Sequence, residues 1–139
     1  AIASGICKGL GYGDNTIAAL LTRGLSEIIE LGISLGAKSE TFSGLSGLGD
    51  LIVTAYSSHS RNNMVGNLIA KGLTLKQIKK KMNMIAEGIN TTKSIYLLSK
   101  KLDIQMPICN KVYQVIFENK LPSDAIAELM SRDLIDERL

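Results

Sequence analysis

Residues 16–35 of the 139-residue chain read TIAALLTRGLSEIIELGISL, and the predicted fold is built around this stretch. Apolar residues and glycines recur in it every three or four positions, which places them on one face of an α-helix. We therefore expect a helix of roughly 30 Å from Thr16 to Leu35, at 1.5 Å per residue, capped by Asp14 or Asn15. The predicted inward face consists of Ile17, Leu20, Leu21, Gly24, Leu25, Ile28, Leu31, Gly32 and Leu35.

The same spacing continues on both sides of this helix. Residues 50–56 (DLIVTAY) are rich in β-branched side chains, but the chain offers no second strand to pair with them, so we expect a short buried helix. Glycine-rich breaks separate the segments at residues 9–13 and 43–49. The sequence thus predicts an all-α domain with no sheet. Its other expected helices are 1–9, 61–71 (with Met64, Val65, Leu68 and Ile69 on one face), 75–82, 91–102, 107–117 and one beginning at Pro122.

Composition excludes several classes of protein. Apolar residues make up 45% and charged residues 21% of the chain, which is typical of a folded domain and not of a disordered tail. The net charge of +3, with no tryptophan, four tyrosines and two phenylalanines, predicts no nucleic-acid partner. Cys7 and Cys109 stand far apart, so a zinc finger is not expected and a reducing cytoplasm is the expected compartment. No apolar run approaches the roughly 20 residues that cross a bilayer, so we expect no membrane insertion.

The start of the chain indicates a longer parent protein. It lacks an initiator methionine, and no polar capping residue precedes the apolar pattern that begins at Ala1. We expect a piece cut from a longer protein that begins within a helix. Processing or tag removal is the alternative explanation.

Asp50 and Thr54 form the first candidate site. Asp50 follows the glycine-rich connector, and Thr54 lies one helical turn later on the same face. One interpretation makes Asp50 an ordinary first-turn residue that interacts with the helix dipole. The other makes it a carboxylate at a cleft that binds a hydroxyl group or orients a catalytic amine. The residues alone leave both open.

Ser60, Arg61 and Asn62 form the second candidate site. They begin a predicted helix, where unpaired N–H groups favour an anion, and the planar guanidinium of Arg61 matches phosphate geometry. The alternative is a simple cap by Ser60 with a solvated Arg61. We interpret His59 as a surface residue, and Glu87 as either a turn residue or a ligand contact.

Seven ordered segments carry a resemblance to a known family. They are AIASGI from Ala1, GLGYGDNT from Gly9, LLTRGLSE from Leu20, GLSGLGDLIVT from Gly44, HSRN from His59, AEG from Ala86 and KLDIQMPI from Lys101. Together they resemble the C-terminal, substrate-binding domain of bacterial-type NAD(P)-dependent glycerol-3-phosphate dehydrogenase. The resemblance implies a helical domain of the 6-phosphogluconate dehydrogenase C-terminal-like type, covering residues 1–139 without its Rossmann partner domain.

The resemblance also implies a reaction. The family interconverts dihydroxyacetone phosphate and sn-glycerol 3-phosphate with NADH or NADPH, and its product feeds phospholipid synthesis. The family's catalytic aspartate matches Asp50, which also lies near the substrate. The substrate-phosphate elements match Ser60, Arg61 and Asn62. The cofactor contacts match Thr54, Arg61, Ile85 and Glu87.

This chain departs from the family in two respects. These 139 residues contain no Rossmann domain, and the resemblance places the catalytic lysine of the family's Lys-Asn-x-x-Ala-Ile-Ala stretch just before Ala1. We therefore expect the parent protein to be the enzyme, with a homo-oligomer as one expected state, and these 139 residues alone to be inactive. The alternative is a non-catalytic all-α binding or scaffold module of shared ancestry.

Overall fold

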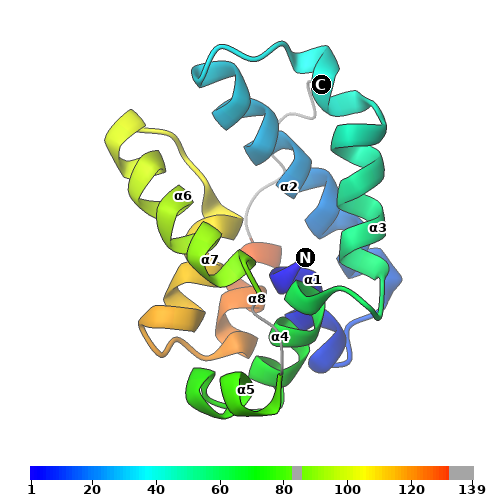
Figure 1. The fold of residues 1–139 in the computed structure, drawn as a ribbon, viewed down its shortest axis with the longest axis vertical. Helices are drawn as coiled ribbons and strands as arrows, with labels where there is room; N and C mark the ends of the chain where they lie inside the picture. The colour runs from blue at the N-terminus through cyan, green and yellow to red at the C-terminus, as the bar shows by residue number, and fades with distance from the viewer. Residues whose placement is uncertain (83–85, 132–139) are drawn as a thin grey trace.

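The computed structural model describes residues 1–82 and 86–131, and within these ranges the chain is helical with no strand. This confirms the all-α prediction, and Figure 1 shows α1 and α4 in the lower half of the view, with α5 below them and α2 and α3 extending above them. No helix among the described residues is both long and apolar enough to cross a membrane. The elements are α1 (Ile2–Gly9), α2 (Asp14–Ser34), the 3₁₀ turn η1 (Ser39–Ser43), the π turn η2 (Leu45–Gly49), α3 (Asp50–Tyr56), α4 (Arg61–Ala70), α5 (Leu75–Lys81), α6 (Gly88–Leu102), α7 (Pro107–Phe117) and α8 (Pro122–Met130).

Helices α1 and α4 touch through their backbones. A Cβ atom built on Gly5 would lie 2.0 Å from the carbonyl oxygen of Asn63, and one built on Gly66 would lie 2.0 Å from that of Ile2. No side chain fits at these distances, so the close approach requires glycine on both helices. The contact fixes the first turn of α4 against α1.

Two clusters of buried side chains form the core. The larger cluster joins α1, α2, α7 and α8, and it includes Ile6, Ile17 and Ile126, each at most 2% exposed. The smaller one joins Val65 and Leu68 of α4 to Ile78 of α5 and Ala86. Helix α4 therefore rests on α1 on one side and on α5 on the other.

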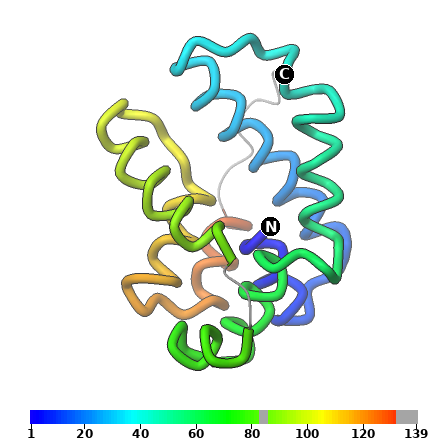
Figure 2. Tube along the Cα trace, viewed as in Figure 1, coloured from blue at the N-terminus to red at the C-terminus, as the bar shows by residue number. Residues whose placement is uncertain are grey.

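The glycine-rich connector is held by one aromatic ring. Figure 2 shows the chain passing from the end of α2 through η1 and η2 into α3. A Cβ atom on Gly32 would lie 2.2 Å from the ring of Phe42, and one on Gly47 would lie 2.2 Å from the Phe42 carbonyl oxygen. Phe42 thus packs the connector against α2, and the connector leads directly into α3.

The helix bounds differ from the predicted ones in a few places. The N-cap of α2 is Gly13, not Asp14 or Asn15, and Asp14 lies in the first turn near the positive end of the helix dipole. Helix α6 begins at Gly88, three residues before the predicted start, because the side-chain oxygen of Asn62 accepts the Gly88 N–H at 3.0 Å. That bond satisfies one of the N–H groups that a helix start leaves without an intrahelical partner.

The predicted short buried helix, α3, buries only Ala55, and several predicted inward positions on other helices are exposed as well. Ile28 is 39% and Leu35 60% exposed, because the larger core cluster covers only the first half of α2. Met64 of α4 is 42% exposed, although Val65 and Leu68 on the same helix are buried as predicted. The apolar pattern therefore located the helices better than it located their buried faces.

Glu27 is a buried charge that caps another helix. Its side chain is 9% exposed, and its carboxylate oxygens accept the N–H groups of Ile108 at 2.6 Å and Cys109 at 3.3 Å. Pro107 begins α7 and has no N–H, so Glu27 of α2 satisfies the next two N–H groups at the start of α7. Helices α2 and α7 are thereby joined by charge-assisted hydrogen bonds.

Replacing Glu27 with alanine should lower the free energy of unfolding by about 3 kcal/mol, because two hydrogen bonds to a charged acceptor are lost and two N–H groups stay buried. Urea unfolding of the 139-residue chain, followed by circular dichroism, measures this loss. Glu30→Ala, an exposed carboxylate on the same helix, is the control and should change the value by less than about 0.5 kcal/mol. Equal losses in the two variants would contradict the capping role of Glu27.

Candidate functional site

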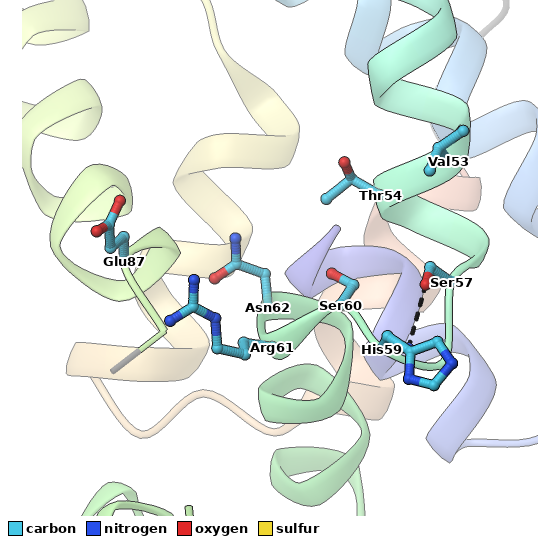
Figure 3. A pocket seen from close by; sticks show the side chains of 8 residues that line it. All are labelled: Val53, Thr54, Ser57, His59, Ser60, Arg61, Asn62 and Glu87. Atoms are coloured by element: carbon cyan, nitrogen blue, oxygen red, sulfur yellow. Dashed lines mark hydrogen bonds between the residues drawn. The ribbon is translucent and has the colours of Figure 1, made fainter. Parts of the chain in front are cut away.

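An open pocket of about 340 Å³ is lined by three parts of the chain. It lies between the last turn of α3, the first turn of α4 and the residue that precedes α6, as Figure 3 shows. This volume suits a small ligand. The lining side chains are those of Val53, Thr54, Ser57, His59, Ser60, Arg61, Asn62 and Glu87.

The first turn of α4 provides the polar side of the pocket. Ser60 is the N-cap, and its Oγ accepts the backbone N–H of Asn63 at 3.2 Å. Arg61 and Asn62 follow as the first two helical residues, where N–H groups and the helix dipole favour a negative ligand. Ser60 therefore caps the helix, which the sequence allowed as an alternative to an anion site. This cap places Arg61 and Asn62 at the pocket.

Asn62 connects this turn to the start of α6. Its Oδ1 accepts the N–H of Gly88, which leaves the amino group of the same amide as a donor. In Figure 3 the Asn62 amide lies beside the Arg61 guanidinium, and Glu87 stands near them at the start of α6. The bond to Gly88 thus fixes both the orientation of the Asn62 amide and the position of Glu87.

Helix α3 provides the other side. Thr54 is partly buried and faces the pocket from α3, opposite Asn62 in Figure 3. Asp50 is exposed at the first position of α3, one turn before Thr54, and does not line the pocket. Ile85 lies outside the described residues. The pocket therefore brings together five of the predicted site residues, namely Thr54, Ser60, Arg61, Asn62 and Glu87. Asp50 lies outside the pocket, one turn earlier on α3.

His59 lies at the rim. It is exposed, and its backbone N–H donates to the Ser57 Oγ at 3.1 Å, the bond drawn in Figure 3. This agrees with the prediction of a surface histidine. Ser57 and Val53 line the pocket without having been predicted, because a serine in a polar loop and a valine in an apolar run carry no distinguishing signal.

The thiols of the chain do not supply a nucleophile here. Burial raises the pKa of the Cys7 thiol to about 11. Burial and the nearby charge of Glu27 raise the pKa of Cys109 to about 11 as well. Both therefore stay protonated near pH 7, and neither lines the pocket. Within the described ranges, no three His, Cys, Asp or Glu side chains are grouped to hold a metal ion.

Comparison with known proteins gives the family. Residues 1–127 match the family model described as "NAD-dependent glycerol-3-phosphate dehydrogenase C-terminus". The chain belongs to this family. Proteins named glycerol-3-phosphate dehydrogenase [NAD(P)+] from Carboxydothermus hydrogenoformans and Salinibacter ruber are 57% and 54% identical to it over 132 residues, or 95% of the chain. The chain spans only 39% and 38% of their lengths.

Solved structures agree in fold. The glycerol-3-phosphate dehydrogenase of Coxiella burnetii superposes with a TM-score of 0.92 at 38% identity, covering 94% of this chain and 40% of that one. A second structure, named DsGPDH of Dunaliella salina, superposes with a TM-score of 0.77 at 25% identity, over 91% of this chain and 23% of that one. The helical arrangement around the pocket is thus that of the C-terminal part of these dehydrogenases.

Replacing Asn62 with alanine should loosen the start of α6, because the N–H of Gly88 loses its acceptor. Amide hydrogen exchange in the first turn of α6 should become about fivefold faster, the factor that corresponds to roughly 1 kcal/mol for one hydrogen bond. Exchange followed by mass spectrometry on the peptide covering residues 87–92 measures it. Asn67→Ala, five residues later on α4, is the control and should leave this peptide unchanged. Identical exchange in the two variants would show that Asn62 does not anchor α6.

Proposed function

We propose that this domain is the substrate-binding part of an NAD(P)-dependent glycerol-3-phosphate dehydrogenase, which interconverts dihydroxyacetone phosphate and sn-glycerol 3-phosphate. The observation that carries the proposal is the convergence of Ser60, Arg61 and Asn62 with Thr54 and Glu87 on one small pocket. Family membership supports the reaction, since the relatives bear that name. These two lines of support are independent, because the pocket comes from the geometry of this chain and the reaction comes from the names of its relatives.

The first turn of α4 would hold the phosphate group of the substrate. A phosphate dianion at this point gains from the helix dipole and from the fork of N–H donors on Arg61. The free amino group of Asn62 adds a further donor, oriented by the bond that its oxygen receives from Gly88. Ser60 contributes chiefly by capping the helix and holding its first turn in place.

The reacting carbonyl would then lie toward α3. Thr54 faces the pocket there, and Asp50 stands one turn away on the same helix. We assign to Asp50 the role of an anionic partner that orients the amine of the catalytic lysine, which the family carries just before the residue matching Ala1. Reduction of a ketone needs such a proton donor at the carbonyl oxygen.

The pocket also fits part of the cofactor. A nicotinamide dinucleotide is far larger than 340 Å³, so only its reactive end can enter this space. When bound, the nicotinamide supplies the hydride. Thr54 and Arg61 would contact this end of the cofactor, and Glu87 would contact it from the start of α6. Ile85 is assigned by resemblance alone, because it lies outside the described residues.

The remainder of the dehydrogenase would cover one face of α3. Ile52 is 43% and Val53 65% exposed beside the pocket, and Leu45 of η2 is 91% exposed. Exposed apolar side chains grouped near a site are typical of a surface that contacts another domain or another copy of the chain.

Both cysteines are free thiols, which supports a reducing compartment such as the cytoplasm.

Arg61→Ala in the full-length protein should lower kcat/KM for dihydroxyacetone phosphate by tens- to hundreds-fold. Each charge-assisted bond to the dianion is worth on the order of 1.5–3 kcal/mol, and about 1.4 kcal/mol is a factor of ten. The loss should be much smaller on unphosphorylated dihydroxyacetone, which never makes the contact. Asp50→Asn should lower kcat more than it changes KM, since it keeps the shape and removes the charge.

Steady-state kinetics of these variants on both substrates tests the assignment, with His59→Ala as the control. The control should stay close to the wild type. Equal losses on both substrates in Arg61→Ala would assign phosphate recognition to another residue. A full-length wild-type protein that reduces neither substrate would favour the non-catalytic binding module.

A further inference from the structure

Asn63 directly follows the pocket residues but points into the protein interior. Its side chain is 6% exposed, and its amino group donates to the carbonyl oxygen of Ala55 at 2.6 Å and to the Ser4 Oγ at 3.3 Å. A buried amide is costly unless it is hydrogen-bonded, so its partners indicate its role. Both partners lie on other helices, α3 and α1.

The Ala55 carbonyl belongs to the last turn of α3. Carbonyl groups in the last turn of a helix have no intrahelical partner, and Ala55 is fully buried. Asn63 of α4 satisfies this group, and the Lys8 Nζ of α1 donates to the next carbonyl, that of Tyr56, at 2.8 Å. The end of α3 is therefore capped by side chains from α4 and α1.

Ser4 completes the network. Its side chain is fully buried, and its Oγ lies within hydrogen-bond distance of the carbonyl oxygens of Ala1, at 2.8 Å, and Ala55, at 3.1 Å. The single hydroxyl proton serves one of these carbonyls, while the oxygen accepts from Asn63. Two buried polar side chains, those of Ser4 and Asn63, thus join three helices, and Asn63 directly follows the pocket residues in the chain.

We propose that Asn63 is a positioning residue that fixes the anion-binding turn of α4 relative to the Thr54 face of α3. The inference rests on the proposed function. Binding energy from a remote phosphate accelerates the reaction only if it places the reacting carbonyl correctly, and that requires a rigid link between the two sides of the pocket. Figure 3 shows these sides, with Thr54 on α3 facing Asn62 and Ser60 on α4.

The backbone of Asn63 strengthens this link. Its N–H donates to the Ser60 Oγ at 3.2 Å, so the same residue completes the cap of α4 and holds the end of α3. Its carbonyl oxygen packs against Gly5 of α1, so closely that a Cβ atom built on Gly5 would lie 2.0 Å from it. Asn63 therefore links α1, α3 and the first turn of α4, and its side chain does not line the pocket.

The test uses the full-length enzyme and the variant Asn63→Asp, which keeps the shape but turns a donor that faces the Ala55 carbonyl into an acceptor. We expect kcat on dihydroxyacetone phosphate to fall at least tenfold. The inhibition constant of inorganic phosphate should stay within about threefold of the wild type, because Arg61 and Asn62 still bind the anion. The preference for dihydroxyacetone phosphate over dihydroxyacetone, as a ratio of kcat/KM values, should fall at least tenfold.

Two control variants separate positioning from general loss of stability. Asn67→Asp makes the same chemical change one turn later on α4, outside the pocket lining, and should leave all three quantities within twofold. Val115→Ala opens space in the core at α7, where no pocket residue lies, and should lower the melting temperature without changing the substrate preference. If Asn63→Asp does not fold, Ser4→Ala removes one acceptor of the Asn63 amide and should lower the preference about threefold.

The outcomes that overturn the inference are distinct. An Asn63→Asp or Ser4→Ala enzyme that melts earlier but keeps the wild-type substrate preference would make the network merely structural. A phosphate inhibition constant that rises as much as kcat falls would mean that Asn63 supports anion binding alone. A wild-type enzyme with no preference for the phosphorylated substrate would overturn the proposed function, and the inference with it.

Discussion

The backbone contact between α1 and α4 is the constraint on which the rest of the structure depends. Because Gly5 and Gly66 leave no room for a side chain, the two helices cannot slide or separate without losing the contact. Helix α4 carries Arg61 at its start and joins both core clusters through its buried side. The position of the polar turn at the pocket is therefore set by main-chain packing at the centre of the domain.

Hydrogen bonds between helices extend this constraint to the other sides of the pocket. Asn63 holds the end of α3, Asn62 holds the start of α6, and Glu27 caps α7 from α2. Each bond satisfies a main-chain group at a helix end, where the helix itself offers no partner. These side chains thus position the helices around the site by forming hydrogen bonds with main-chain groups at the ends of neighbouring helices.

The sequence was sufficient for the helices and for most of the pocket. The 3,4 spacing, the cap at Thr74 and the prolines at 107 and 122 are local signals, and Ser60, Arg61 and Asn62 stand together in the chain. Glu27 caps α7 and Asn63 holds the end of α3, and neither residue carries a local signal of that role in the sequence. Their roles depend on partners 81 and 8 residues away, which only the folded arrangement brings into contact.

A crystal structure of the full-length protein with sn-glycerol 3-phosphate would show directly whether α4 begins with a phosphate-binding turn that α1 and α3 hold in place. We expect phosphate oxygens within hydrogen-bond distance of the Arg61 guanidinium and the Asn62 amino group, with Asn63 still bonded to Ala55. A phosphate bound elsewhere, for example on the lysines of α5, with the first turn of α4 empty, would contradict this expectation.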